Sequence, residues 1–320
     1  MRKPFSLLIG ALSLLVVTSC GSNPYSKTNR MHKQKARQLT KELKTFPPEN
    51  GGEALTLNYG EDWVGTTNFG LRKPNYVIIH HTAQESVEHT LKTFTLPRTS
   101  VSSHYVISDD GVVYQMLNDY YRGWHAGAGK WGNDTDLNSS SIGIELDNNG
   151  FEPFSEAQIS SLIELLQVLK ERHKIPTANF IGHSDIAPSR KVDPNKNFPW
   201  ERLAEEGFGY WYDDIPLEPL FAGDTIAVDN GNSSWSRQLP EELVVADSSS
   251  IYSSSVDSNS IDNPANGITP ELALRVIGYN TTDLDAAIRA FKLHFIQDEV
   301  NAVLTERDLK ILYNLSRKYM

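Results

Sequence analysis

The stretch YVIIHH, Tyr76 to His81, decides the fold class that we predict for this chain of 320 residues. Its continuous apolar and β-branched run is typical of a strand buried within a parallel sheet. Two histidines end the run. Because consecutive side chains of a strand point to opposite faces, only one of His80 and His81 can face a given site, and parity alone does not choose between them.

Strand and helix patterns alternate after this stretch. An Asp-Asp-Gly turn at 109–111 between two apolar runs predicts a hairpin. Ser155 to Gln158 fits the start of a helix, and an apolar helical stripe follows it. The fold class predicted for residues 61–214 is therefore α/β, with a mixed central β-sheet flanked by helices. The further strands that we expect are His104–Ser108, Val112–Leu117, Ser141–Leu146 and Asn179–His183.

The first twenty residues, MRKPFSLLIGALSLLVVTSC, predict export. Two basic residues precede an apolar run that is too short to span a bilayer comfortably, as in a signal peptide. Small residues lead to Cys20, the single cysteine of the chain, and this junction resembles a bacterial lipobox. An ordinary signal peptide with an incidental cysteine is the alternative, but an unpaired thiol is a liability in an exported protein. We therefore predict a lipoprotein signal peptide at 1–19 and acylation of Cys20.

Residues 20–60 are expected to form a polar tether behind the acylated cysteine. Seven Lys and Arg residues lie between Gly21 and Glu49. One interpretation is that their positive charges attract the tether to anionic lipid headgroups. The simpler interpretation is the solvated surface of a tether with a short helix. The formal net charge of the whole chain is −10, which argues against nucleic acid as its partner.

Composition changes again towards the C-terminus. Residues 215–267 contain runs such as DSSSIYSSSVDSNS, which cannot bury enough apolar surface to fold, and they predict a Ser-rich linker. Order is expected to return at 268–320, where Thr269 and Pro270 begin a helix and Leu284 to Phe295 carries an apolar helical face. A third helix is expected between Thr305 and Tyr319. A helical module of about fifty residues is marginal as an independent domain unless it docks on the first one.

Polar residues suited to a metal lie at the ends of the predicted strands. The stretch IGHSDIAPSRKVDPNKNFPW, Ile181 to Trp200, is a proline-rich loop that carries His183 and Asp193. Two imidazoles and a carboxylate with one open position form the ligand pattern of a catalytic zinc site. Any one of these histidines alone is more often a structural residue, and the spacing is no short local metal motif.

Five motifs occur in a fixed order along the chain. They are IIHHTA (78–83), VSSHY (101–105), WHAG (124–127), SIGIELDN (141–148) and GHSDIAPSRKVDPNKNFPW (182–200). Through these motifs the chain resembles the zinc-dependent N-acetylmuramoyl-L-alanine amidases, in particular their lipoprotein members, and more distantly phage lysozyme-amidases and peptidoglycan recognition proteins. The resemblance covers roughly residues 76–214. The segment AAIRAFKLHF, Ala286 to Phe295, resembles more weakly the three-helix peptidoglycan-binding-like module of such enzymes, whereas the Ser-rich insertion is longer than their linkers.

The resemblance implies a role for each polar residue. His80, His183 and Asp193 match the metal ligands, which implies one Zn²⁺ per chain. Glu145 matches the catalytic glutamate, and Lys191 is expected to stabilise the oxyanion. Without the resemblance, Glu145 would be interpreted as a carboxylate on a strand surface, and Lys191 as a solvated charge of a loop. In the WHAG motif, Trp124 and His125 are expected to bind substrate, although His125 can equally be a hydrogen-bond donor of its loop.

The activity implied is hydrolysis of the amide bond between N-acetylmuramic acid and L-alanine in peptidoglycan or muropeptides. A non-catalytic peptidoglycan-binding lipoprotein is the alternative, but such a protein needs neither the three ligands nor Glu145 and Lys191. A cytosolic recycling amidase is opposed by the export signal. We expect an exported monomer, attached through Cys20 to the outer membrane and facing the periplasm.

Overall fold

The computed structural model describes residues 23–44, 71, 73–214 and 268–320. The predicted signal peptide, Cys20 and the Ser-rich linker lie outside these residues. The chain divides into two compact units, Met1–Phe69 and Gly70–Met320. The first unit contains α1 (Ser26–Lys44), a helix of 19 residues in the predicted tether. In the described part of the chain, no helix has both the length and the apolar character to cross a membrane.

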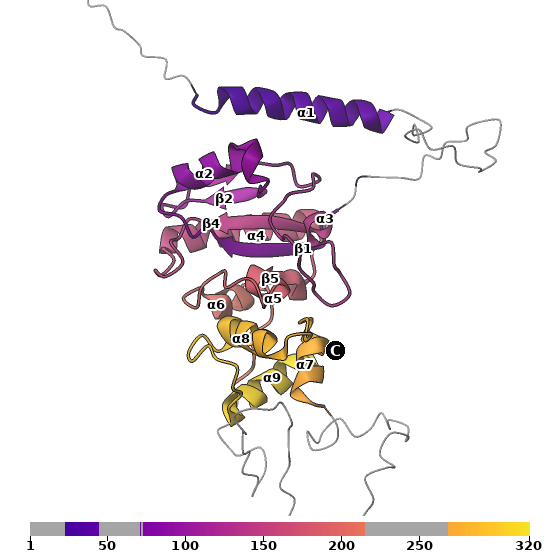
Figure 1. Cartoon of the computed structure of the whole chain (residues 1–320). Coiled ribbons are helices and arrows are strands. Elements are labelled where there is room, and N and C mark those ends of the chain that lie inside the picture. Colours follow the sequence, from indigo (N-terminus) through magenta and orange to yellow (C-terminus); the bar gives the residue numbers. More distant parts are fainter. Residues whose placement is uncertain (1–22, 45–70, 72, 215–267) are drawn as a thin grey trace, which may run out of the picture. The chain divides into compact units, whose positions relative to one another are not determined.

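The second unit contains a five-stranded mixed sheet, as the sequence predicts (Figure 1). The strand order is β3-β2-β4-β1-β5, and β2, β4, β1 and β5 run parallel. The predicted hairpin is present, because β3 pairs antiparallel with β2 at one edge. β5 is shorter than expected, since His183 already begins a helix. The strands are β1 (Tyr76–His81), β2 (Tyr105–Ile107), β3 (Val113–Gln115), β4 (Ser141–Leu146) and β5 (Phe180–Gly182).

The register of β1 with β4 separates two faces of the sheet. Val77 pairs with Ile142 and Ile79 with Ile144, and all four pack in one core against the apolar stripe of α4 (Glu156–His173). The side chain of Ser155 caps α4 by accepting from the backbone of Gln158, as its sequence predicts. The other face carries His80 paired with Glu145, and Ile78 paired with Gly143. One sheet face is therefore packed with apolar side chains, and the opposite face is free to hold a polar site.

Short helices connect the strands and shape this polar face. One of them follows β5 directly and begins at His183, and another begins at Trp200, after the proline-rich loop. The short elements are α2 (Val87–Thr95), the 3₁₀ turns Pro97–Thr99 and Thr177–Asn179, α3 (Leu137–Ser140), α5 (His183–Ile186) and α6 (Trp200–Glu205).

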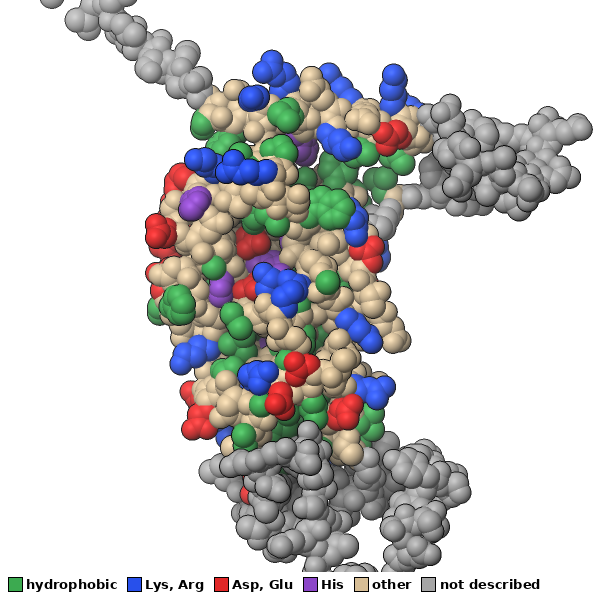
Figure 2. Space-filling model, in the orientation of Figure 1, with side chains coloured by type: hydrophobic (Ala, Val, Ile, Leu, Met, Phe, Trp, Pro, Cys, Tyr) green, Lys and Arg blue, Asp and Glu red, His purple; other side chains and the backbone are tan. Residues whose placement is uncertain are grey.

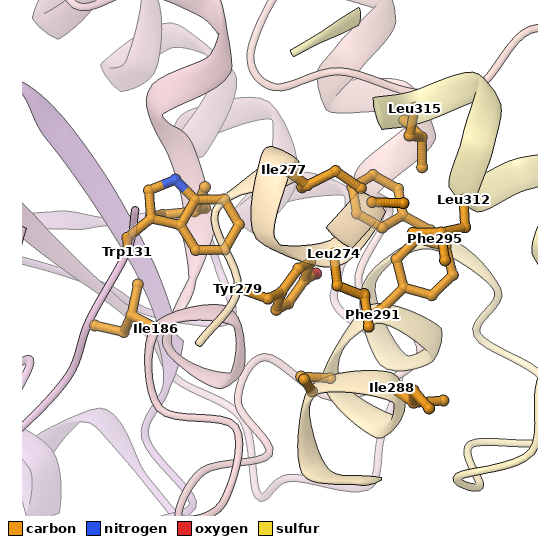
Figure 3. Close-up of a cluster of buried hydrophobic side chains, with 14 of the residues drawn as sticks. Trp131, Ile186, Leu274, Ile277, Tyr279, Ile288, Phe291, Phe295, Leu312 and Leu315 are labelled. Carbon is orange, nitrogen blue, oxygen red and sulfur yellow. The ribbon is translucent and has the colours of Figure 1, made fainter. Parts of the chain in front are cut away.

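The C-terminal segment forms three helices that dock beside α5 and α6 (Figure 1). They are α7 (Pro270–Ile277), α8 (Leu284–Phe295) and α9 (Glu306–Lys318), and side chains of Thr269, Asp283 and Thr305 cap their starts. Their apolar faces do not form a core of their own. Leu274, Phe291 and Leu312 belong to a buried cluster that also contains Ile78 and Ile186 from the sheet region (Figure 3). The helices thereby bury apolar surface that a unit of this size cannot bury alone.

Candidate metal centre

Three polar side chains from separate segments converge on the polar face of the sheet. His80 lies near the end of β1, His183 is the first residue of α5, and Asp193 follows in the proline-rich loop. The Nδ1 atoms of His80 and His183 lie 2.9 Å apart, and Asp193 Oδ2 lies 3.1 Å and 3.0 Å from them. All three residues are buried. Within the described part of the chain, they form a group that could hold a metal ion.

The size of this triangle fits a small divalent cation. For ion–ligand bonds of about 2.0–2.1 Å, the corners of a tetrahedron lie about 3.3–3.4 Å apart, slightly more than the three observed separations. Hydrogen bonds do not explain the arrangement equally well. Each ring nitrogen carries at most one hydrogen, which points to one acceptor, whereas each of the three atoms lies close to both others. The donor set, two imidazoles and a carboxylate, is one that divalent transition metals accept.

Hydrogen bonds at the far nitrogens orient both imidazoles. His183 Nε2 lies 3.1 Å from the Ala126 carbonyl oxygen, so it carries the proton and leaves Nδ1 with its lone pair. His80 Nε2 lies 3.2 Å from His125 Nδ1, and His125 Nε2 lies 3.4 Å from the Ser141 hydroxyl. The Ser141 hydroxyl itself donates to the Leu137 carbonyl. We therefore assign the proton of His80 to Nε2, which donates to His125 Nδ1, and the proton of His125 to Nε2, which donates to the Ser141 hydroxyl oxygen. This assignment leaves the Nδ1 lone pair of His80 pointing into the centre.

Burial keeps the imidazoles of His80 and His125 neutral. It lowers the pKa of His80 to about 4, with a further contribution from the neighbouring His183. It also lowers the pKa of His125 well below the usual value. Burial alone would raise the pKa of Asp193, but its close polar contacts with His183 and His80 outweigh this effect and lower it. Neutral imidazoles and an ionised carboxylate are the protonation states that bind a metal.

Hydrogen bonds hold the backbone of the WHAG motif, which carries both His125 and the Ala126 carbonyl. The side-chain oxygen of Asn138 accepts from the backbone N–H groups of His125 and Ala126, at 3.0 Å and 2.9 Å. Arg190 donates to the Ala126 carbonyl at 2.9 Å. Gly143 leaves room for the His125 ring, because a Cβ atom at this position would overlap it. Gly143 is therefore required on the polar face of β4.

Glu145 is a buried carboxyl group beside the ligands. It pairs with His80 in the β1–β4 register, so the two side chains leave the sheet on the same side. Burial raises the pKa of Glu145 well above its usual value, and the charge of Asp193 raises it further, while the Lys191 ammonium acts in the opposite direction. Lys191 is partly buried. These two residues supply a protonatable carboxyl and a positive charge next to the three ligands.

The remaining candidate residues differ in their contacts with the centre. The neighbour His81 faces the other side, where its Nδ1 accepts from the backbone N–H of Asn195 at 3.1 Å. His125 is buried against His80, as described above. Trp124 is 50% exposed, and the Arg122 guanidinium lies 4.4 Å from its ring centroid. Trp124 also lines a cavity of about 560 Å³ together with Phe94, Leu96, Pro97 and Val101. In Figure 2, histidine and acidic side chains lie next to basic ones near the middle of the visible face.

Sequence reasoning missed several residues that orient the ligands. Ser141 has the same strand parity as Gly143 and Glu145, so alternation in SIGIEL could have placed it on the polar face. Asn138 and the Ala126 carbonyl act through loop geometry that has no local sequence signal. His294 contacts the ligand-bearing segment from α8, and no local sequence signal indicates this contact.

The fold and the site together define an α/β protein in which two histidines and an aspartate of the described residues form a group that could hold a metal ion. Residues 70–196 match the family model described as N-acetylmuramoyl-L-alanine amidase. The sheet domain of the chain is thus similar to this family, as the sequence motifs predict.

The chain is also similar to individual proteins of known sequence or structure. The chain is 39% identical over 163 residues to N-acetylmuramoyl-L-alanine amidase AmiD of Escherichia coli, and this match covers 46% of the chain and 58% of that relative. The chain thus spans little more than half the length of this curated relative. A solved complex of Escherichia coli AmiD with anhydro-N-acetylmuramic acid-L-Ala-D-γ-Glu-L-Lys is similar at 26% identity and a TM-score of 0.58, over 80% of this chain and 93% of that chain. The crystal structure of AmpDh3 from Pseudomonas aeruginosa is similar at 25% identity and a TM-score of 0.58, over 83% and 99%.

The contact between His80 and His125 predicts a measurable effect on metal binding. His125→Phe keeps an aromatic ring over Gly143 but removes the acceptor for His80 Nε2–H. Loss of such a partner typically lowers metal affinity about 10–100-fold. The dissociation constant is measured by competition with a chromogenic chelator. The matched control is the neighbouring Trp124→Phe, which should leave metal affinity unchanged. Unaltered affinity in His125→Phe would contradict the orienting role.

Proposed function

We propose that this chain is a metal-dependent amidase that hydrolyses the amide bond between N-acetylmuramic acid and the L-alanine of the stem peptide, in peptidoglycan or muropeptides. The observation that carries the proposal is the position of Glu145, a buried carboxyl with a raised pKa, directly beside His80 in the three-ligand centre. The names of the relatives support the same bond, and the complex of Escherichia coli AmiD contains a muropeptide of this class.

We propose Zn²⁺ as the ion, one per chain, held by His80, His183 and Asp193. The ligand types and the size of the triangle suit tetrahedral zinc with one open position. When bound, the ion would polarise the scissile carbonyl and make water acidic enough to react near neutral pH.

The residues of the chain would move the proton and stabilise charge. Glu145 would take a proton from the attacking water and deliver it to the departing amine of L-alanine. Its raised pKa suits both steps, because the carboxyl can then hold the proton between them. The Lys191 ammonium, whose charge already acts on Glu145 and His80, would stabilise negative charge on the carbonyl oxygen.

We propose different tasks for the two substrate-binding candidates of the WHAG motif. The half-exposed ring of Trp124 beside an apolar cavity offers a surface on which a sugar or peptide can pack. His125 is buried between His80 and Ser141, which supports a role in orienting His80 in preference to direct contact with substrate.

We further propose that the protein is an exported, monomeric lipoprotein, acylated at Cys20 and attached to the outer membrane facing the periplasm. The charge distribution of α1 supports attachment to a membrane surface. Six of its basic residues follow one another at spacings of three or four and therefore share one helix face, while Ala36, Leu39 and Leu43 lie opposite. Figure 2 shows Lys and Arg side chains along this helix. The six residues are Lys27, Arg30, Lys33, Arg37, Lys41 and Lys44.

The reaction is tested by digestion of purified anhydro-muropeptides and of intact sacculi with the full chain. Mass spectrometry should show free stem peptides that begin with L-alanine. Because the ligands are expected to hold a catalytic ion, a chelator should stop the release, and added Zn²⁺ should restore it. Binding of sacculi without release of peptide, with the metal present, would instead favour the non-catalytic alternative.

Replacement of Glu145 by Gln should separate activity from stability. Turnover of the metal-loaded enzyme should fall about 10²–10⁴-fold, because the proton carrier is lost. The effect on stability should have the opposite sign: in urea unfolding of the metal-free protein near neutral pH, the variant should be more stable than the native chain. Below the unfolded pKa of about 4.3 the carboxyl is protonated in both states, so the variant and the native chain should have similar stability. As the pH rises through the raised folded pKa, the native chain should lose stability that the variant keeps. A less stable Glu145→Gln variant near pH 7 would show that the carboxylate has a structural role.

The membrane proposal is tested with a chain that starts at residue 21 and therefore lacks the acylated cysteine. It should bind vesicles that contain phosphatidylglycerol, and neutral phosphatidylcholine vesicles far more weakly. Replacement of Lys33, Arg37 and Lys41 by Gln should weaken binding about a hundredfold, since each basic residue near an anionic surface contributes roughly 1 kcal/mol. The matched control changes three exposed basic residues of the other unit to Gln, Lys92, Lys174 and Arg289, and should bind as before. Equal losses in both triple variants would argue against α1 as the contact.

A further inference from the structure

Asp185 is a fully buried carboxylate two residues after the ligand His183. Its Oδ2 atom accepts from the backbone N–H of Gly182 at 2.7 Å, which closes the turn that carries His183. Two further contacts come from the C-terminal segment, one from the connection between α7 and α8 and one from α8. The Tyr279 hydroxyl donates to Oδ1 at 2.7 Å, and His294 Nδ1 lies 2.8 Å from Oδ2. The carboxylate thus joins the ligand-bearing turn to a segment about one hundred residues further along the chain.

The same turn also reaches the third ligand. The backbone N–H of Ser184 donates to the carbonyl oxygen of Asp193 at 2.8 Å. His183 and Asp193 are therefore held relative to each other by the short segment 182–185. Any displacement of Asp185 would move this segment and change the separation of two of the three ligand atoms.

His294 is held on both sides by aromatic rings. It stacks on Trp200 with ring centroids 3.8 Å apart and planes 15° apart, and on Phe295 at 4.0 Å and 17°. Trp200 is only 2% exposed, so it packs against α8 and offers no surface to a substrate. The Gln297 side chain donates to the Phe198 carbonyl at 2.5 Å, which fastens the end of α8 to the same loop. These contacts leave His294 little freedom to move away from Asp185.

Tyr279 is fixed in a similar way on the other side of the carboxylate. Its ring meets Trp131 edge to face at 5.1 Å (Figure 3). The backbone N–H of Gly132 donates to the Gly278 carbonyl at 2.8 Å. Gly278 has a positive φ of 133°, and a Cβ atom here would overlap the Trp131 ring. The chain before α8 therefore lies directly against the loop that follows the WHAG motif.

We propose that helices α7–α9 are part of the metal centre, with Tyr279 and His294 as positioning residues that hold Asp185 and, through it, the turn that presents His183. This role differs from that of an independent peptidoglycan-binding module. A buried carboxylate that loses its donors is strongly disfavoured, so the turn would rearrange to hydrate Asp185. The inference requires that the centre binds a cation, but it does not require that the chain cleaves peptidoglycan.

The test measures the Zn²⁺ dissociation constant of the full chain by chelator competition, at a temperature where circular dichroism shows every variant folded. Tyr279→Phe removes only the hydroxyl, and His294→Leu removes the second donor. Each should weaken zinc binding at least tenfold. His294→Asn retains an N–H donor near the position of Nδ1 and should recover most of the affinity.

The matched control is Ile288→Ala, a buried position on α8 in the same apolar cluster, whose side chain has no group that can donate to Asp185. It should lower the melting temperature and leave zinc affinity unchanged. The proposal is overturned if Tyr279→Phe and His294→Leu bind zinc as tightly as the native chain, or if Ile288→Ala loses affinity to the same extent. Loss of affinity in the donor variants would support the proposal even if no muropeptide were cleaved.

Discussion

Two imidazole nitrogens and one carboxylate oxygen lie within 3.1 Å of one another in a buried part of the molecule. Lone pairs held this closely repel one another unless a cation or extra protons lie between them. Burial lowers the pKa of His80 to about 4, so this ring adds no second proton near neutral pH. The three atoms are therefore arranged as a group that could hold a metal ion. The rest of the structure keeps the three ligands in place and in the protonation states that bind it.

Most of this support comes from backbone groups and small residues. The Ala126 carbonyl fixes the tautomer of His183, and Asn138 holds the backbone that carries this carbonyl. Gly143 makes space for the ring that orients His80. All these contacts lie on one face of the sheet, because the apolar residues of alternate parity are packed against α4 on the other face. Because side chains alternate along a strand, the residues that pack against α4 and the residues of the polar site lie on opposite faces of the sheet.

The sequence predicted the parts of the fold that follow from local periodicity. Alternation and β-branched runs located the strands, and Ser155 marked the start of α4. Parity could not choose between His80 and His81, because both follow the same apolar run; the choice came from the family resemblance. Contacts of Asp185 with Tyr279 and His294 were not predictable. They join residues separated by the Ser-rich segment, and they depend on tertiary packing that leaves no periodic signal in either partner.

Three buried carboxyl groups differ in the hydrogen-bond donors and charges that surround them. Glu145, Asp185 and Asp119 are 8%, 0% and 4% exposed, so burial alone does not distinguish them. Asp185 accepts from three donors, and Asp119 accepts from Tyr105 and His173, whose hydrogen bonds outweigh burial and lower its pKa. Glu145 instead faces the negative charge of Asp193, and its pKa is raised. A buried carboxyl that is supplied with donors is held in place by the fold, whereas Glu145 lies where its charged form is disfavoured, an environment typical of groups that exchange protons.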